Sequence, residues 1–338
     1  MAFGSGVTGE SQGNALRIIT LLDTAIASTN LGDQIIMEAV RDEIETLAPD
    51  AFVYSVATHD RPGRKSRSLI ARSDDVIVGG TNLLSSRMWF RPLWKLSPTD
   101  MLRRFRVTLL GVGWYQSQAK PDLYSRTLLR RVLAPSGWHS VRDSYTGRML
   151  ASTGIPNVVN TGCPTLWNLT PERCARIPPV KAARVITALN TYMPDPTADA
   201  ALLRLLRRHY TDVYFWPQTA SDRAYAADLD PDLLFLEPRL KALDALLESN
   251  ESLDYVGNRL HAGIRALQRG RRAVIVEIDN RAREMGWDFG LPTVPRPDFE
   301  RLVAMVRNPL PTRIRLPSAE IELWRTALAR GPGPGAPA

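Results

Sequence analysis

The sequence has 338 residues, 44% hydrophobic and 23% charged, which is ordinary for a globular protein and long enough for two domains. No apolar run reaches the roughly 18 residues that span a bilayer, no signal peptide is expected, and two cysteines exclude a disulfide framework, so we expect a cytoplasmic protein. The net charge of +8 favours an anionic partner, but the arginines are scattered and no nucleic-acid motif occurs, so nucleic acid is not an expected partner.

The first half of the chain alternates strand and helix signals. Residues 1–13 predict a flexible leader, and the G-x-G-x-x-G match at 4–9 lacks the preceding strand of a dinucleotide site. Apolar runs predict strands at 16–22, 51–56, 75–78, 106–110, 138–143 and 157–159. Helical periodicity predicts helices at 34–47, 122–133 and 144–152. Residues 61–72 are expected to form a polar, basic connection.

The second half repeats this alternation after a proline-rich linker at 171–182. Strands are expected at 183–189, 212–215, 233–236, 252–257 and 273–278. Helices are expected at 199–209, after a loop at 218–222, and at 240–247, 260–268, 282–285, 298–307 and 318–328. Residues 292–297 read as a proline-rich connection, and 331–338 as a disordered tail.

Repeated strand–helix units predict an α/β protein with two Rossmann-like domains facing each other across a cleft, a GT-B-like architecture. The expected division is an N-terminal domain at 1–170, the linker, a C-terminal domain at 183–290, and helices at 291–330 that pack back on the core.

Arg259 and His261 are the leading candidates for chemistry. They lie two residues apart where the strand at 252–257 gives way to the helix at 260–268, a position where ligands bind in open α/β sheets. The first turn of that helix and the guanidinium of Arg259 favour an anion, and His261 can move a proton near neutral pH. The alternative for His261 is a hydrogen-bonded core histidine.

Other strand ends carry polar or glycine residues towards the same edge. These candidates are Asn30 and Asp33, then Gly79, Gly80 and Thr81, and then Arg142. Helix capping explains Asn30 and Asp33 equally well, and a simple turn is the alternative for the glycines. Cys163 is expected to be a buried apolar residue, and His59, His139 and His209 to be structural. No metal-ligand spacing occurs, so neither metal nor cofactor is expected.

Five short elements occur in this order along the chain: Asn30-x-Gly32-Asp33, Gly79-Gly80-Thr81-Asn82, Val141-Arg142-Asp143, Gly162-Cys163-Pro164 and Arg259-Leu260-His261-Ala262. With these elements the chain resembles the polysaccharide pyruvyl transferase family over roughly 16–290. The resemblance implies phosphoenolpyruvate as donor, a glycan or lipid-linked sugar as acceptor, and a pyruvate ketal as product. It implies that Arg259, Leu260 and His261 bind the donor, with Arg142 as a second contact. It places the donor on the C-terminal domain and the acceptor on the N-terminal domain. Two residues depart from the family pattern, Val78 before the glycine pair and Val112 between Gly111 and Gly113.

The residue chemistry fits this donor, whose phosphate and carboxylate suit two guanidinium groups. Ketal formation needs a proton on C3 and removal of hydroxyl protons, for which His261 is the expected acid and Asp33 the expected base. A nucleotide-sugar glycosyltransferase of the same fold and a non-enzymatic member remain alternatives, with a dinucleotide-dependent oxidoreductase less favoured. A lipid-linked acceptor would bring the protein to the inner membrane face as a peripheral protein. The sequence leaves the oligomeric state open.

Overall fold

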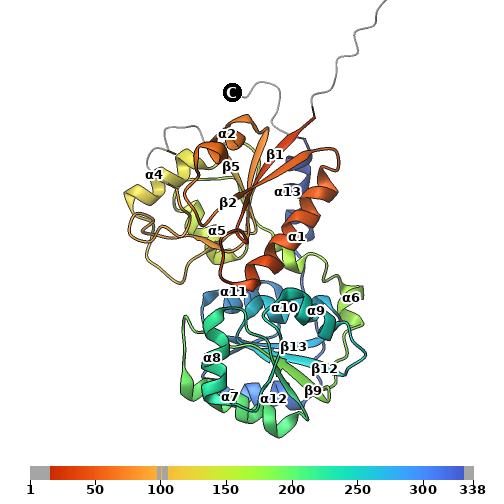
Figure 1. The fold of residues 1–338 in the computed structure, drawn as a ribbon. Coiled ribbons are helices and arrows are strands. Elements are labelled where there is room, and N and C mark those ends of the chain that lie inside the picture. Colours follow the sequence, from red (N-terminus) through yellow and green to blue (C-terminus); the bar gives the residue numbers. More distant parts are fainter. Residues whose placement is uncertain (1–15, 97–99, 101–105, 331–338) are drawn as a thin grey trace, which may run out of the picture.

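The computed structural model describes residues 16–96, 100 and 106–330. The expected leader at 1–13, with its glycine motif, and the expected tail at 331–338 lie outside them. The described chain forms two lobes, each built around its own sheet (Figure 1). Within these residues no helix combines the length and apolar character needed to cross a bilayer.

The first sheet has the order β2-β1-β3-β5, and every pair in it is parallel. Its strands are β1 (Ile18–Asp23), β2 (Phe52–Ala57), β3 (Asp75–Gly79) and β5 (Val107–Leu110). Two short parallel pairs accompany it, β4 (Asn82–Leu84) with β6 (Gly113–Trp114) and β7 (His139–Val141) with β8 (Val158–Asn160). Because helices cover both faces of such a sheet, β1 and β3 are almost uniformly apolar and buried.

The second sheet has the order β11-β10-β9-β12-β13-β14 and is also parallel throughout. Its strands are β9 (Arg184–Thr187), β10 (Val213–Phe215), β11 (Leu234–Phe235), β12 (Leu253–Gly257), β13 (Arg272–Glu277) and β14 (Thr293–Pro295). Strand order reverses between β9 and β12, so the ligand crevice expected of an open sheet lies at the carboxyl ends of these two strands. Two parallel sheets flanked by helices confirm the predicted GT-B-like fold class.

In chain order, the helices up to residue 175 are α1 (Leu31–Leu47), α2 (Arg64–Arg72), α4 (Leu123–Val132) and α5 (Ser144–Ala151), followed by the 3₁₀ turn η1 (Pro164–Leu166) and α6 (Pro171–Ala175). Those that follow are α7 (Pro196–His209), α8 (Ala220–Leu229), α9 (Leu240–Leu247), α10 (Leu260–Gln268), α11 (Asn280–Phe289), α12 (Phe299–Arg307) and α13 (Ser318–Ala329).

Three segments that the sequence predicts to be connections contain a helix or a strand. The polar connection expected at 61–72 contains α2, because Arg, Lys and Leu are good helix formers even where Ile70 is the one buried side chain of that helix. The linker at 171–182 begins with α6, since Thr170 caps it and Pro171 suits the first helical position. Residues 292–297 contain β14, whose Pro295 is tolerated because β14 is an edge strand.

The lobes meet through a shared hydrophobic core that includes Ile35 and Ile36 of α1 and Ala262 and Ile264 of α10. Polar contacts flank this core: Ser144 at the start of α5 donates its N–H and hydroxyl to Asp288 of α11, at 2.6 and 2.9 Å. We call the region where α1 and the β7–α5 turn meet α10 and α11 the junction.

Helix α13 lies beside α1 in the first lobe, although it ends the described chain (Figure 1). The Trp324 indole N–H donates to the Leu109 carbonyl at 3.1 Å, and Arg325 forms a two-bond ion pair with Glu43 at 2.7 Å. Helix α12, in contrast, packs on β13 and α7 of the second lobe.

Candidate active site

Asp33, Arg142, His261 and Arg281 come from both lobes and interact electrostatically at the junction. Burial and the charge of Arg142 lower the pKa of both His261 and Arg281. Burial raises the pKa of Asp33, and the charge of Arg281 partly offsets this rise. We call these four residues the junction set. Three of them were candidates from the sequence, and the fold brings them together.

Within the junction set, Arg142 is the residue whose guanidinium group has nitrogen atoms that make no hydrogen bond to the described residues. It directly follows β7 and its side chain is 1% exposed. Its Nη2 donates to Asn82 Oδ1 at 2.7 Å and to Asp143 Oδ2 at 3.4 Å, and its Nε forms an ion pair with Asp143 Oδ2 at 3.4 Å. Nε and Nη1 have no hydrogen-bond partner among the described residues. Buried polar atoms of this kind are uncommon. Two donors of a buried cation are therefore available to an anion.

Gly113 allows Arg142 to take this position. A Cβ on Gly113 would lie 2.3 Å from Arg142 Nη2, so any larger residue would displace the guanidinium. This contact gives a physical reason for the second glycine of Gly111-Val112-Gly113.

His261 is buried in the first turn of α10, and its Nε2 lies 3.7 Å from Cys163 Sγ. Burial and the charge of Arg142 lower the pKa of His261 to about 3, so the imidazole is neutral at neutral pH. The Cys163 thiol is buried and its pKa is raised by that burial, as expected for an apolar role. A neutral imidazole can accept a proton or donate a hydrogen bond, but it cannot serve as an acid in the free protein.

Asp33 lies in the first turn of α1 and is also buried. Burial raises the pKa of its carboxyl group, against hydrogen bonds from Ser28, whose hydroxyl donates at 2.5 Å, and from Thr81. Asn30, at the start of the same helix, accepts from the Gly32 N–H at 3.1 Å, which is a capping contact.

Gly79 and Gly80 allow α1 to pack closely against the end of β3. Gly80 has a φ of +60°, and a Cβ there would lie 2.0 Å from Ile36. Thr81 follows with a φ of +51°, a left-handed conformation that costs free energy in a residue with a branched side chain. The left-handed backbone after β3 therefore places the Thr81 side chain where it can hydrogen-bond to Asp33.

Arg281 was not among the candidates from the sequence. It follows β13 in the first turn of α11, and its Nε donates to Asp279 at 2.8 Å, with a further bond from Nη2 to the Tyr192 hydroxyl. Burial and the charge of Arg142 lower the pKa of Arg281 to about 10. The signal that could have identified it is Asp279-Asn280-Arg281 at a strand end, the same pattern that singled out Arg142.

Arg259 is placed differently from the other cations. Its Nη2 pairs with both carboxylate oxygens of Asp222, one at 2.6 Å, and its Nε donates to the Leu189 carbonyl at 3.1 Å. The Asp222 carboxylate also accepts the N–H groups of Gln218 and Thr219. Arg259 thus ties the start of α10 to the start of α8.

The N-terminus of α10 remains uncapped by any side chain among the described residues. The first N–H groups of a helix have no partner within it, so those of Leu260 and His261 can donate to an anion at the start of α10. Leu260 itself is a buried side chain, so a contact with a ligand would come from its backbone.

Four buried amide side chains follow the carboxyl ends of the second sheet. They are Asn190 after β9, Gln218 after β10, Asn258 after β12 and Asn280 after β13. Each carries an amide atom without a hydrogen-bond partner in the part of the chain that the structure describes. These single amide atoms, at the ends of four neighbouring strands, make this edge a candidate site for a polar ligand.

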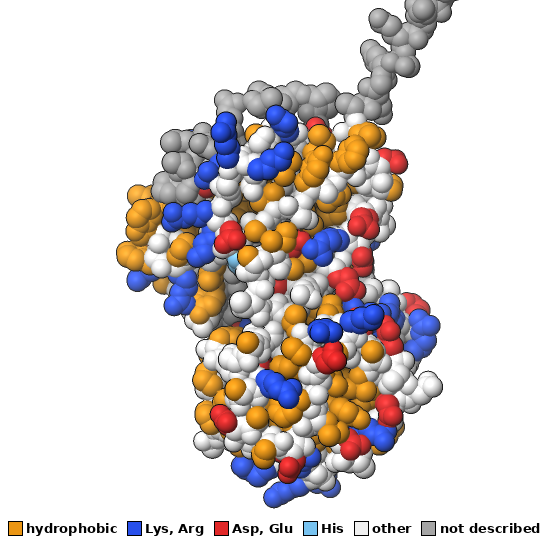
Figure 2. Space-filling model, viewed as in Figure 1, with side chains coloured by type: hydrophobic (Ala, Val, Ile, Leu, Met, Phe, Trp, Pro, Cys, Tyr) orange, Lys and Arg blue, Asp and Glu red, His pale blue; other side chains and the backbone are white. Residues whose placement is uncertain are grey.

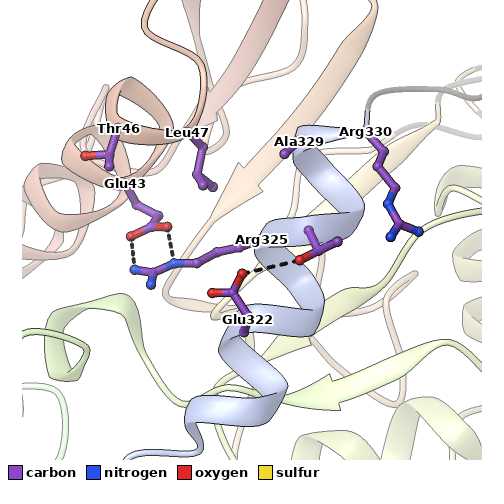
Figure 3. Close-up of a pocket in the computed structure, with 8 residues that line it drawn as sticks. Glu43, Thr46, Leu47, Glu322, Arg325, Ala329 and Arg330 are labelled. Carbon is purple, nitrogen blue, oxygen red and sulfur yellow. Dashed lines mark hydrogen bonds and ion pairs between the residues drawn. The ribbon is translucent and has the colours of Figure 1, made fainter.

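A pocket of about 520 Å³ lies away from the junction, between α1 and α13. Its lining includes the Glu43–Arg325 ion pair, which holds the two helices together (Figure 3). This pocket therefore lies at the contact between α1 and α13, and none of the sequence candidates lines it. No cluster of three or more His, Cys, Asp or Glu side chains suited to a metal occurs within 16–96, 100 and 106–330.

His139 is a structural histidine and should make stability depend on pH. Its Nδ1 accepts the Leu109 N–H at 3.3 Å and its Nε2–H donates to the Ala134 carbonyl at 2.9 Å, and burial lowers its pKa to about 4. The unfolded chain therefore binds a proton that the folded chain excludes between about pH 6.5 and 4. Lowering the pH through this window should cost roughly 3 kcal/mol of unfolding free energy through His139. Urea unfolding at pH 7 and pH 4 measures this, and the His139→Asn variant should show a shallower pH dependence; an unchanged slope would contradict the assignment.

A family model described as polysaccharide pyruvyl transferase matches residues 30–280, a range that contains Asp33, Arg142 and His261. A search of curated proteins gave no match. Among solved structures, the chain is similar to a candidate UDP-N-acetylglucosamine 2-epimerase from Listeria monocytogenes, with 9% identity, 94% and 92% of the two chains covered, and a TM-score of 0.48. It is also similar to S. aureus MnaA in complex with UDP, with 12% identity, coverage of 94% and 93%, and a TM-score of 0.45. A UDP-GlcNAc 2-epimerase from Neisseria meningitidis gives 14% identity, coverage of 77% and 82%, and a TM-score of 0.36.

Proposed function

Since the chain belongs to the polysaccharide pyruvyl transferase family, an enzyme family, we propose that it transfers the pyruvyl group of phosphoenolpyruvate to a sugar of a polysaccharide or glycolipid. The product is a ketal that bridges two sugar hydroxyls, and phosphate is released. The observation that carries this proposal is the pair of unpartnered guanidinium donors on buried Arg142, beside Arg281 and the uncapped start of α10.

Phosphoenolpyruvate fits this arrangement because it carries two anionic groups on three carbons. Burial lowers the pKa of Arg281, and the charge of Arg142 lowers it further, so the two cations repel each other in the free protein. A phosphate and a carboxylate between them would relieve that repulsion while satisfying the free donors of Arg142. Arg259 would contribute through the position it gives α10.

The reaction needs one proton delivered to C3 of the donor and one proton removed from each of the two sugar hydroxyls. A proton added to C3 makes C2 electrophilic, so that one sugar hydroxyl attacks C2 and loses its proton. The second hydroxyl then attacks C2, phosphate leaves with its bonding electrons, and the second hydroxyl proton departs with it or with a base. The junction set would hold the donor and exchange these protons.

In our proposal the acid and base expected from the sequence exchange roles. Burial raises the pKa of Asp33, which suits a carboxyl group that carries a proton to C3. His261 is neutral in the free protein, which suits a group that accepts a hydroxyl proton. Donor anions beside Arg142 would cancel part of its charge and so raise the pKa of His261, making it a stronger base when substrate is bound.

Replacing Asp33 with Asn tests the acid role. We expect kcat to fall about 10²-fold with little change in the KM for phosphoenolpyruvate, because the amide keeps the hydrogen bonds but has no proton to transfer. The loss of activity at alkaline pH that deprotonation of Asp33 causes should also disappear. Asp42→Asn is the matched control, since Asp42 is exposed on the same helix. Full kcat in Asp33→Asn would remove Asp33 from the mechanism.

The activity itself is tested by incubating the protein with a glycan extract and either phosphoenolpyruvate or a panel of nucleotide sugars. We expect phosphate release with phosphoenolpyruvate and a pyruvyl group on the glycan by mass spectrometry. Sugar transfer from a nucleotide sugar, without phosphate release from phosphoenolpyruvate, would favour the glycosyltransferase alternative. Activity with neither donor class would favour a non-enzymatic role.

A further inference from the structure

The two most exposed large apolar side chains of the described residues belong to two segments of the first lobe that pack against each other. Phe90 is 80% exposed and Leu123 is 78% exposed, and Trp89, at 59%, stacks edge-on against Tyr124 with ring centroids 5.3 Å apart. Figure 2 shows hydrophobic side chains gathered at the left edge of the upper lobe, where Figure 1 places α4, with basic side chains around them. Leaving such side chains in water is unfavourable, so a contiguous group indicates an interaction site.

The segment that carries Trp89 and Phe90 is fixed to the start of α4. The Asp122 N–H donates to the Ser86 carbonyl at 3.0 Å, and the Met88 N–H donates to the Ser125 hydroxyl at 2.9 Å. The Ser125 hydroxyl in turn donates to Ser86 at 3.2 Å. The aromatic side chains therefore stand on an anchored surface.

Positive charge surrounds these apolar side chains. Residues 84–96 and 115–133 contain Arg87, Arg91, Lys95, Lys120, Arg126, Arg130 and Arg131. The one acidic residue of these two segments, Asp122, caps α4 by accepting the Ser125 N–H at 2.8 Å. Because α4 buries Ser125, Leu128, Leu129 and Val132, its arginines lie on the same exposed face as Leu123.

We propose that this aromatic–basic platform, formed by Trp89, Phe90 and Leu123 with Arg87, Arg126 and Arg131, binds the surface of an anionic lipid bilayer. Aromatic and leucine side chains insert at the boundary between headgroups and acyl chains, and arginines around them attract anionic headgroups. A protein partner would need an acidic surface of complementary shape, whereas a bilayer needs only this combination of exposed apolar tips and unbalanced positive charge.

The platform adjoins the junction through Arg91, whose guanidinium lies over the Tyr115 ring, 4.7 Å from its centroid. The carbonyl of the preceding residue, Trp114, accepts a hydrogen bond from the Asn280 side chain of α11 at 3.5 Å. For the proposed reaction, this would bring a sugar carried on a lipid to the junction. Bilayer binding is measured without any turnover. An experiment can therefore contradict bilayer binding without contradicting the proposed pyruvyl transfer, and the reverse also holds.

Vesicle flotation with the full-length protein tests the proposal. We expect binding to vesicles that contain phosphatidylglycerol, weaker binding to pure phosphatidylcholine vesicles, and loss of the difference at high salt. Phe90→Ser with Leu123→Ser should weaken binding at least tenfold, and Arg126→Gln with Arg131→Gln also about tenfold or more, with a smaller salt dependence. Circular dichroism should show both double variants folded.

A control variant shows whether the loss of vesicle binding is specific to the platform. Trp287 is 67% exposed on α11 and Phe52 is 54% exposed on β2, so Trp287→Ser with Phe52→Ser removes similar apolar area elsewhere. Equal loss in this control, or equal binding to neutral and anionic vesicles, would overturn the proposal. So would a dimer in solution that dissociates in Phe90→Ser with Leu123→Ser, because the platform would then bind a second copy of the chain.

Discussion

Replacing Arg142 with Lys should lower kcat/KM for phosphoenolpyruvate by roughly 10³-fold while leaving the protein folded. Lys keeps the positive charge beside Asp143 but cannot present the two donors, Nε and Nη1, that make no hydrogen bond to the described residues. Hydrogen bonds between charged groups contribute about 1.5–3 kcal/mol each, so losing two costs the bound donor about 3–6 kcal/mol. Phosphate release gives the rate, and calorimetric titration with phosphoenolpyruvate gives the affinity.

Arg148→Lys provides the control for this experiment. Arg148 belongs to α5, which follows Arg142, but its side chain is 67% exposed and its nearest carboxylate, on Glu284, is 4.0 Å away. We expect its kinetics to match those of the unmodified protein. If Arg142→Lys binds phosphoenolpyruvate and turns it over at the normal rate, the anion is held elsewhere and the proposed donor site is wrong.

The sheets could be predicted from the sequence because parallel strands are buried on both faces and so appear as uninterrupted apolar runs, as β1 and β13 do. The prediction failed at α2 and β14, where burial is slight or where the strand lies at an edge. There the local composition is polar or rich in proline, and tertiary contacts decide the structure.

The sequence could suggest where candidate site residues lie, but not their partners. Strand ends drew attention to Asp33, Arg142 and His261, because a parallel sheet brings its carboxyl ends to one edge, and all three are buried in the structure. Which arginine keeps hydrogen-bond donors without partners depends on residues distant in sequence. Asp222 pairs closely with Arg259, whereas Nε and Nη1 of Arg142 make no hydrogen bond in the described part of the chain. The low pKa of His261 likewise follows from burial, which its sequence neighbours do not specify.

The second large effect expected is a loss of stability when the Arg259–Asp222 ion pair is broken. Both side chains are buried, with 7% and 0% exposed, so removing one partner leaves the other charge unpaired away from water. Breaking such a pair typically costs about 3–5 kcal/mol. We therefore expect Asp222→Asn and Arg259→Met each to lower the unfolding free energy by several kcal/mol, and the double variant to lose less than the sum of the two. Urea unfolding of the four proteins gives this coupling free energy.

An exposed pair of the same residue types supplies the control. Arg207 and Asp230 form a two-bond ion pair at 2.9 and 3.0 Å, but the Arg207 side chain is 35% exposed, so Arg207→Met and Asp230→Asn should each cost about 1 kcal/mol or less. The comparison also decides what Arg259 does. If Asp222→Asn, at a residue given no contact with substrate, lowers stability and turnover together, Arg259 acts by positioning α10. If Asp222→Asn leaves stability intact while Arg259→Met abolishes donor binding, Arg259 is instead a direct ligand of the donor.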